Sequence, residues 1–218
     1  MSTAGNSHAD YAARLLERGM VGVPLLDGGK HLDLPAMGYD AVHREAMLKK
    51  LKELAFAGIC FQLAQKPPSI DELGSWFRAS GANIGIVGGV RNLLVLDFDH
   101  IGHFETWRNG HETLLRSTPI ARTPSGFHVF LRSKAALPTS SLHFGMRRVG
   151  HAKALGGYVV ASPSVLRNGS RYEWMPGQSP FDCEPAIVDG LSELSLAPVS
   201  PLKAGYDRLR GRGRFEDA

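Results

Sequence analysis

Cysteine is scarce in this chain: only Cys60 and Cys183 occur among its 218 residues. Neither lies in a Cys-x-x-Cys pair or in a cluster with histidines, so we expect no structural zinc site. Two isolated thiols cannot form a disulfide framework either. Such cysteines are typical of reduced thiols in the cytosol, which predicts a cytoplasmic location.

Long apolar runs are also missing. No segment approaches the roughly 20 apolar residues that a membrane helix needs, and residues 1–5 show no basic stretch leading into an apolar one. The sequence therefore predicts neither a membrane span nor a signal peptide. It also lacks the Gly-x-x-x-x-Gly-Lys-Ser/Thr motif, so this chain carries no P-loop helicase.

The remaining composition is that of an ordinary globular protein, with 43% hydrophobic and 21% charged residues. This is enough apolar material for a real core, and the length allows one large domain or two small ones. The net charge of +4 and the isoelectric point near 9.2 mildly favour an anionic partner.

Helical patterns dominate the first half of the chain, and strand patterns dominate residues 83–175. This order predicts an α+β fold in which helices cover one face of a largely antiparallel sheet. We expect one domain over residues 1–200 and a basic, Arg- and Gly-rich linker or tail over residues 201–218. The expected helices cover 8–19, 41–57, a segment opened by Ser69, and 102–116; the expected strands cover 21–26, 83–89, 93–99, 127–131, 158–161 and 172–174, with 83–89 and 93–99 paired as a hairpin.

The most informative segment is Leu93–Asp99, where an apolar strand runs into two carboxylates spaced i, i+2. Side chains alternate along a strand, so Asp97 and Asp99 project to the same face. Two adjacent carboxylates repel each other unless a cation lies between them. A hard divalent cation, Mg²⁺ or Mn²⁺, fits oxygen ligands of this kind and takes further ligands from phosphates. The alternative is an Asp-x-Asp that only begins a turn.

A second candidate site follows the turn at Ser125 and Gly126. The strand after it carries His128 and Phe130 on one face and Phe127 on the other. The turn offers a hydroxyl and backbone amides that could form an anion-binding nest. With His128, these groups could hold a phosphate opposite a metal on the two aspartates. The alternative is a structural histidine among apolar neighbours.

A third candidate segment, residues 153–164, joins Lys153 to a glycine pair and a strand. The glycines permit close approach of the backbone, and Lys153 could face a phosphate as a point charge. The alternative is a hairpin with a solvated lysine.

Taken together, these segments resemble the bifunctional primase/polymerase (prim-pol) domain of the archaeo-eukaryotic primase superfamily, found in plasmid and phage replication proteins. The resemblance rests on Leu-Asp-Phe-Asp, Ser-Gly-Phe-His and Gly-Gly-Tyr-Val-Val-Ala-Ser-Pro-Ser in that order. Val23-Pro24-Leu25 with Gly28-Gly29-Lys30, and Asn83-Ile84-Gly85-Ile86, also fit the pattern. The resemblance covers roughly residues 10–175.

The resemblance implies a helix-rich N-terminal half joined to an RRM-like catalytic module. It implies template-directed transfer of NTPs or dNTPs onto a 3′-hydroxyl with Mg²⁺ or Mn²⁺, on a single-stranded DNA template. A helicase portion commonly follows such a domain, so we expect a helicase portion or partner outside this chain. If the protein is encoded by a phage or plasmid, we expect it in the cytoplasm of a bacterial host cell. Template binding would use Arg and Lys contacts to phosphates.

Residue by residue, Asp97 and Asp99 match the metal-binding acids of the family. Ser125 and His128 match the triphosphate motif. Lys153 falls where the family often has a basic residue, and Lys30 is a further candidate for nucleotide binding.

One position departs from the family pattern, because His151 stands where a third acid is usual. Histidine suits Mn²⁺ better than Mg²⁺, which prefers oxygen ligands. His151 is then a substituted ligand, or another acid completes the site, or catalysis is weakened; a slip in the alignment is a further alternative. Two other functions therefore stay open: a catalytically weakened single-stranded-DNA-binding module, and a metal-dependent nuclease or phosphohydrolase.

Overall fold

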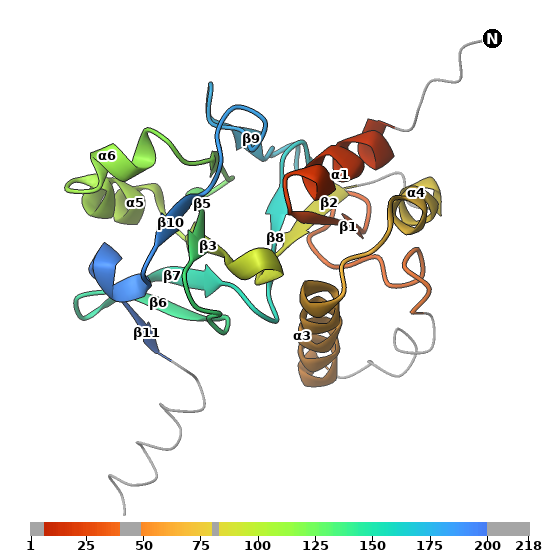
Figure 1. The fold of residues 1–218 in the computed structure, drawn as a ribbon, viewed down its shortest axis with the longest axis horizontal. Coiled ribbons are helices and arrows are strands. Elements are labelled where there is room, and N and C mark those ends of the chain that lie inside the picture. Colours follow the sequence, from red (N-terminus) through yellow and green to blue (C-terminus); the bar gives the residue numbers. More distant parts are fainter. Residues whose placement is uncertain (1–6, 40–48, 80–82, 200–218) are drawn as a thin grey trace, which may run out of the picture.

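The computed structural model describes residues 7–39, 49–79 and 83–199. They form two lobes, each built around its own sheet (Figure 1). The basic tail expected at 201–218 and the first part of the helix expected at 41–57 lie outside the described residues. The α+β class predicted from the sequence is confirmed, although the strands divide between two sheets.

The smaller lobe holds a three-stranded antiparallel sheet in the order β1-β2-β8, made of β1 (Val21–Leu25), β2 (Asn83–Val87) and β8 (Tyr158–Ala161). Helices lie on both of its faces, so the expectation of helices on one face is wrong for this lobe. The helix α1 (Ser7–Glu17) brings Ala12 against Gly22. On the other face, α3 (Lys49–Gln65) brings Phe56 against Tyr158.

The helix α4 (Ile70–Ala79) packs beside α1. It begins as the sequence predicts, because Ser69 and Glu72 cap each other: the Ser69 hydroxyl accepts the Glu72 amide, and the Glu72 carboxylate accepts the Ser69 amide. This reciprocal pair satisfies two of the amides that a helix N-terminus leaves free.

The larger lobe holds an eight-stranded sheet in the order β11-β6-β7-β3-β5-β4-β9, with β10 added in parallel to β5. The helices α5 (Ile101–Arg108) and α6 (Glu112–Leu115) cover one face; the single helix expected at 102–116 is broken between them. The short 3₁₀ turn η2 (Leu191–Leu194) precedes the last strand. The strands are β3 (Leu93–Phe98), β4 (Ile120–Arg122), β5 (Phe127–Ser133), β6 (Ser140–Phe144), β7 (Arg147–Lys153), β9 (Glu173–Trp174), β10 (Ala186–Val188) and β11 (Leu196–Val199).

The hairpin expected between β2 and β3 does not form, because the two strands belong to different sheets. The turn η1 (Val90–Asn92) separates them. Gly89, Arg91 and Asn92 all have positive φ there, which turns the chain out of the small sheet. The chain thus crosses from one lobe to the other directly before the two aspartates.

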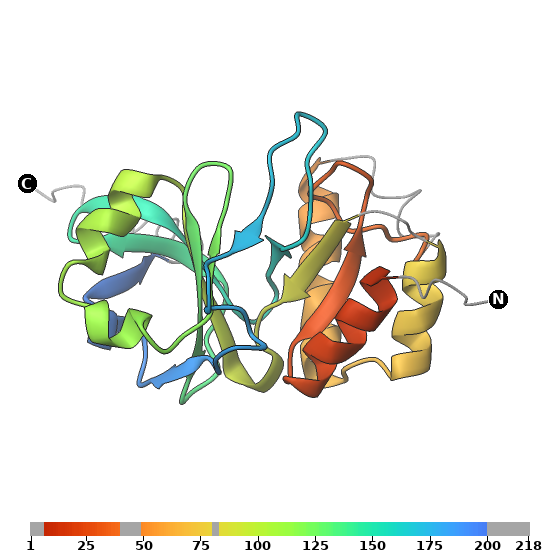
Figure 2. The ribbon, with the colours of Figure 1, turned by 90° about the horizontal axis from the view of Figure 1, so that it is seen from above.

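The strand β3 is buried on both faces, and its residues alternate between two cores. Leu93 and Val95 belong to the core shared with the smaller lobe, whereas Leu94 and Leu96 belong to the core under α5 and α6. The face of Asp97 is therefore the face of the large sheet that meets the smaller lobe. Figure 2 shows the two lobes from above, with the segment between β8 and β9 standing between them.

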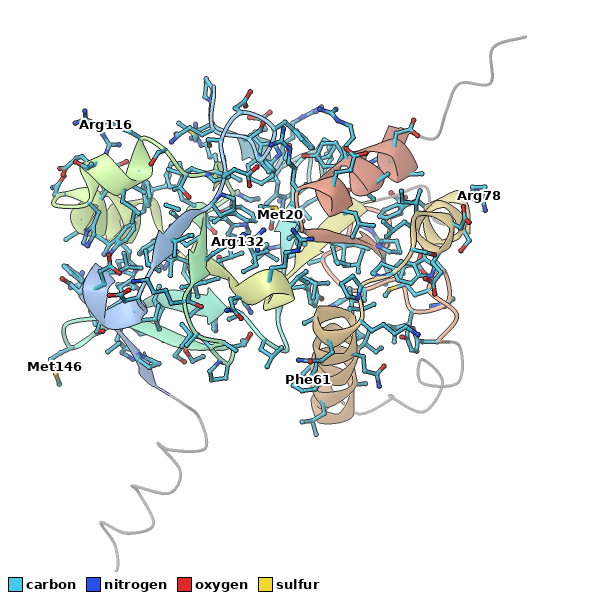
Figure 3. All side chains as sticks on the ribbon, in the orientation of Figure 1. Met20, Phe61, Arg78, Arg116, Arg132 and Met146 are labelled. Carbon is cyan, nitrogen blue, oxygen red and sulfur yellow. The ribbon has the colours of Figure 1, made fainter. Side chains whose placement is uncertain are left out.

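Arg132 on β5 ties the lobes together from the larger side. Its guanidinium donates to the carbonyls of Val90 and Arg91 and to those of Arg18 and Gly19, at 2.9–3.3 Å. Figure 3 places Arg132 beside Met20, at the centre of the molecule. Since one rigid fork satisfies four carbonyls of two separate segments, it fixes the smaller lobe against β5.

Candidate active site

The site is a row of side chains that runs across the large sheet. Asp97 on β3 lies directly opposite His128 on β5 and opposite His151 on β7. Residues directly opposite in antiparallel strands share a face, so the three side chains project together toward the smaller lobe. The strand pairing therefore brings together residues that are far apart in the chain.

Two glycines allow the flanking strands to come close at this point. A Cβ at Gly126 would lie 1.9 Å from the carbonyl oxygen of Phe98, and a Cβ at Gly150 would lie 1.8 Å from that of Asp97. No side chain fits at such distances from backbone atoms. The glycines thus let β5 and β7 close on β3 from both sides, beside the aspartates.

Asp97 and His128 form the fixed part of the site. The Nε2 atom of His128 lies 3.1 Å from Oδ1 of Asp97, and the histidine side chain is only 5% exposed. Burial alone would raise the pKa of the Asp97 carboxyl. The hydrogen bond and the charge of His128, followed by the charge of Lys153, outweigh burial and hold that pKa below its ordinary value. Asp97 is therefore a carboxylate at neutral pH.

The sequence-predicted metal ligands converge. One ligand atom each from Asp97, Asp99 and His151 lies within 4.8 Å of the others, the one such group among the described residues. Two carboxylates and an imidazole form a donor set that fits Mn²⁺ or, through the oxygens, Mg²⁺. The Nδ1 atom of His151 lies 4.0 Å from Oδ1 of Asp99. Burial lowers the pKa of His151, and the charges of Lys153 and Arg148 act in the same direction.

A β-bulge in β7 brings one more residue to this face. Leu142 pairs with Gly150, but the next residue of β6, His143, pairs with Arg148, so Val149 is an extra residue. The extra residue reverses the alternation. Val149 enters the core behind the sheet, and Arg148 reaches His151, with 2.7 Å between a guanidinium nitrogen and Nε2.

The remaining candidates for nucleotide binding are Lys153, Ser125 and Lys30. Lys153 is half-buried opposite Val95, and its charge acts on both Asp97 and His151. Ser125 is exposed in the turn before β5. Lys30 is exposed in the turn after β1, where its backbone carbonyl accepts a hydrogen bond from the hydroxyl of Tyr158. The charge of Lys153 thus acts on the row, whereas no such interaction of the Lys30 side chain is found among the described residues.

The expectation of free amides in the Ser125 turn is wrong. The amides of Ser125 and Gly126 both donate to the hydroxyl of Thr123, at 3.4 and 2.9 Å. Thr123 holds the turn closed, so the Ser125 hydroxyl, and not an amide nest, is what this turn offers to a ligand.

Sequence reasoning missed Tyr172. Its ring lies 5.9 Å from that of His128, and its side chain is buried beside the site. Burial and the nearby charge of Asp97 raise the pKa of Tyr172 to about 12, so the hydroxyl stays protonated. Nothing in the sequence near Tyr172 signals this position, because the segment after β8 brings it back over β5.

The family model for "Bifunctional DNA primase/polymerase, N-terminal" matches residues 12–188. The chain belongs to this family. The match extends over most of both lobes and includes every residue of the row. Membership in this primase/polymerase family implies a metal-dependent function in replication, with DNA and nucleotides as substrates. No curated protein matches the chain significantly. None of the described helices is long and apolar enough to cross a membrane.

Proposed function

We propose that this chain catalyses template-directed nucleotidyl transfer, adding NTPs or dNTPs to a 3′-hydroxyl on single-stranded DNA. The observation that supports this best is the convergence of Asp97, Asp99 and His151 next to the buried His128. The site lies where the two lobes meet, on the face of the large sheet that the helices α5 and α6 do not cover. A helicase portion outside this chain would separate the strands that it copies.

Asp97 and Asp99 would hold Mg²⁺ or Mn²⁺, which when bound lowers the pKa of an attacking hydroxyl and stabilises charge at the phosphorus. His128 is oriented by Asp97 through Nε2, and its buried Nδ1 has no partner among the described residues. His128 would donate to a phosphate oxygen of the nucleotide through Nδ1, and the groups that cover this nitrogen would have to move aside for that contact.

Ser125 and Lys153 would complete the nucleotide contacts, because one offers a hydroxyl at the edge of the row and the other a charge close to Asp97. Lys30 was predicted to bind the nucleotide as well, but no contact among the described residues supports it. Template binding would depend on phosphate contacts from Arg and Lys, so it should weaken as salt rises.

A second candidate is a DNA-binding module with weakened catalysis. One observation favours it: Nε2 of His151 is occupied by Arg148. The family resemblance also implies that His151 stands where a third acid is usual. The sequence also left open a third function, that of a metal-dependent nuclease or phosphohydrolase. Such an enzyme would use the same aspartates.

A primer-extension assay with Mg²⁺ or Mn²⁺ separates these functions. A polymerase needs template and nucleoside triphosphates, a nuclease degrades DNA without them, and a binding module retains DNA without either reaction. Asp97→Ala and Asp99→Ala should each lower incorporation by about 10³-fold or more, since the metal contributes several kcal/mol to the transition state. Asp10→Ala, an exposed acid on α1, is the control. Extension at the wild-type rate by either aspartate variant would place the site elsewhere.

A further inference from the structure

The side chain of Arg148 contacts the ring of His151, the third residue of the candidate metal site. Its guanidinium nitrogen lies 2.7 Å from Nε2 of His151, while Nδ1 of the same ring faces Asp99 at 4.0 Å. This contact depends on the β-bulge at Val149, because regular alternation would turn Arg148 into the core. The neighbouring Arg147 is exposed too, but its side chain makes no hydrogen bond or ion pair with any described residue.

The contact determines which nitrogen of His151 carries the proton. An arginine only donates hydrogen bonds, so Nε2 must present a lone pair and the ring must be neutral. A neutral imidazole then carries its hydrogen on Nδ1, the atom that faces the acids. A protonated nitrogen cannot ligate a metal. His151 as held by Arg148 is therefore in the wrong tautomer to bind a metal through Nδ1.

We propose that Arg148 is a positioning residue: it holds His151 out of the metal site until a phosphate group of the substrate attracts the guanidinium away. This rests on the metal role proposed for Asp97 and Asp99. Arginine forms paired hydrogen bonds with phosphate that it cannot form with one ring nitrogen, and the Arg148 side chain is exposed to such a ligand. Once Nε2 is free it can carry the proton, and Nδ1 becomes a ligand.

The device couples two binding events in both directions. Phosphate binding by Arg148 should strengthen metal binding, and metal binding should strengthen phosphate binding by the same factor. The ligand chemistry is a phosphate of either the nucleic acid or the incoming nucleotide. His151 would then complete the ligand set of the metal only in a protein that already holds substrate.

The tautomer is measured directly by ¹⁵N NMR of the histidine ring nitrogens, without metal. We expect wild-type His151 to carry its proton on Nδ1. Arg148→Gln should shift the population toward the Nε2-protonated form, whereas Arg147→Gln, which removes an equal charge one residue away, should not. A wild-type His151 protonated on Nε2, or a tautomer that ignores Arg148→Gln, would overturn the proposal.

Metal binding gives a second readout, by titrating Mn²⁺ and following its electron paramagnetic resonance. Arg148→Gln should bind Mn²⁺ about tenfold more tightly than wild type, the usual scale for a partner behind a metal ligand. Removing a positive charge alone would also tighten binding, so the comparison is repeated in a His151→Ala background. There Arg148→Gln should tighten Mn²⁺ binding clearly less than it does when His151 is present, because only the loss of charge remains. If Arg148→Gln tightens Mn²⁺ binding equally in both backgrounds, Arg148 acts only through its charge and the proposal is overturned.

The source of the phosphate is resolved by adding either a single-stranded oligodeoxynucleotide or a deoxynucleoside monophosphate before the Mn²⁺ titration. The true ligand should tighten Mn²⁺ binding to wild type and leave Arg148→Gln unchanged. Failure of both to do so would overturn the coupling. Mn²⁺ binding that is unaffected by Asp97→Ala would instead contradict the proposed function, and the NMR experiment would still decide the tautomer.

Discussion

The two strands that flank β3 each bring a histidine opposite Asp97, but the two histidines are held differently. On the β5 side, His128 is 5% exposed and bonds to Asp97 itself at 3.1 Å. On the β7 side, His151 is 32% exposed and bonds to Arg148 rather than to an acid. The same register position thus carries a fixed group on one side and an adjustable group on the other.

The difference follows from what surrounds each strand. Tyr172 covers His128, and Arg132 further along β5 ties that strand to the smaller lobe. β7 contains a bulge and joins β6 through a turn at which Met146 is fully exposed, at the end of the molecule in Figure 3. A preorganised binding group belongs on the first flank, and a residue that must change partners belongs on the second.

The backbone, in contrast, is equally tight on both flanks, and this gives the largest expected effect. Gly126→Ala and Gly150→Ala each place a Cβ within 2 Å of a carbonyl oxygen of β3. Since a backbone atom cannot move aside cheaply, each variant should lose about 1–3 kcal/mol of unfolding free energy or more. Urea unfolding measures the loss, and primer extension should fall with it.

Gly102→Ala is the matched control, because nothing lies within 4 Å of a Cβ at that helical position. It should be neutral or stabilise by roughly 0.5–1 kcal/mol, as replacing a helical glycine usually does. If either Gly126→Ala or Gly150→Ala unfolds like wild type, the flank on that side is not held by backbone contact.

The sequence alone predicts the acids and the fixed flank. The alternation of β3 and β5 predicts that Asp97 and His128 share a face, as they do, and it assigns Phe130 to the opposite core from Phe127. Asp99 lies one residue beyond β3 and is close to Asp97. These segments are regular strands, in which the period of two holds at every residue. The faces of these side chains could therefore be predicted without knowing which strands pair with β3 or β5.

The adjustable flank could not be predicted in the same way. The bulge at Val149 reverses the alternation, and no residue type there marks it, so Arg148 appears in the sequence as one more surface arginine. The supposed β2–β3 hairpin failed for a related reason: the positive φ at Arg91 and Asn92 is carried by residues other than glycine. Tyr172 returns to the site only through tertiary folding. Such features depend on contacts between distant segments rather than on local pattern.

The next effect tests the fixed flank. His128→Ala should raise the KM for nucleotide by roughly 10- to 100-fold, the cost of losing a hydrogen bond to a charged group, and should weaken template binding less. His151→Ala, on the other flank, should leave that KM nearly unchanged. Steady-state kinetics with varied nucleotide, and DNA binding measured in parallel, check both. A variant that loses DNA affinity with an unchanged KM would reverse the assignment of His128.

The same variant changes the pH dependence of activity. In wild type the pKa of Asp97 lies below its ordinary value of 3.8, so the carboxylate persists throughout the neutral and mildly acidic range. His128→Ala removes the hydrogen bond and charge that lower this pKa, and burial then raises it. As pH falls, activity of the variant should therefore be lost at a higher pH than in wild type. If the activity of wild type and of the variant falls at the same acidic pH, His128 does not act on Asp97.

The smallest expected effect tests the adjustable flank through the identity of the metal. If His151 stands in the position of the third acid, wild-type activity should favour Mn²⁺ over Mg²⁺, because imidazole suits Mn²⁺ better. His151→Asp adds a carboxylate beside the metal and should raise Mg²⁺-dependent activity by up to about tenfold. Titrating both metals on wild type and variant measures the ratio.

The gain should fall short of a full third acid for a reason specific to β7. Arg148 lies within reach of position 151, so an aspartate there would form an ion pair with the guanidinium and share its charge with the metal. His151→Asp combined with Arg148→Gln should therefore recover more Mg²⁺-dependent activity than His151→Asp alone, whereas adding Arg147→Gln should not. An unaltered ratio of Mn²⁺ to Mg²⁺ activity in every variant would mean that position 151 never meets the metal. The second flank would then serve the template or the fold, and the two histidines opposite Asp97 would share a register but no function.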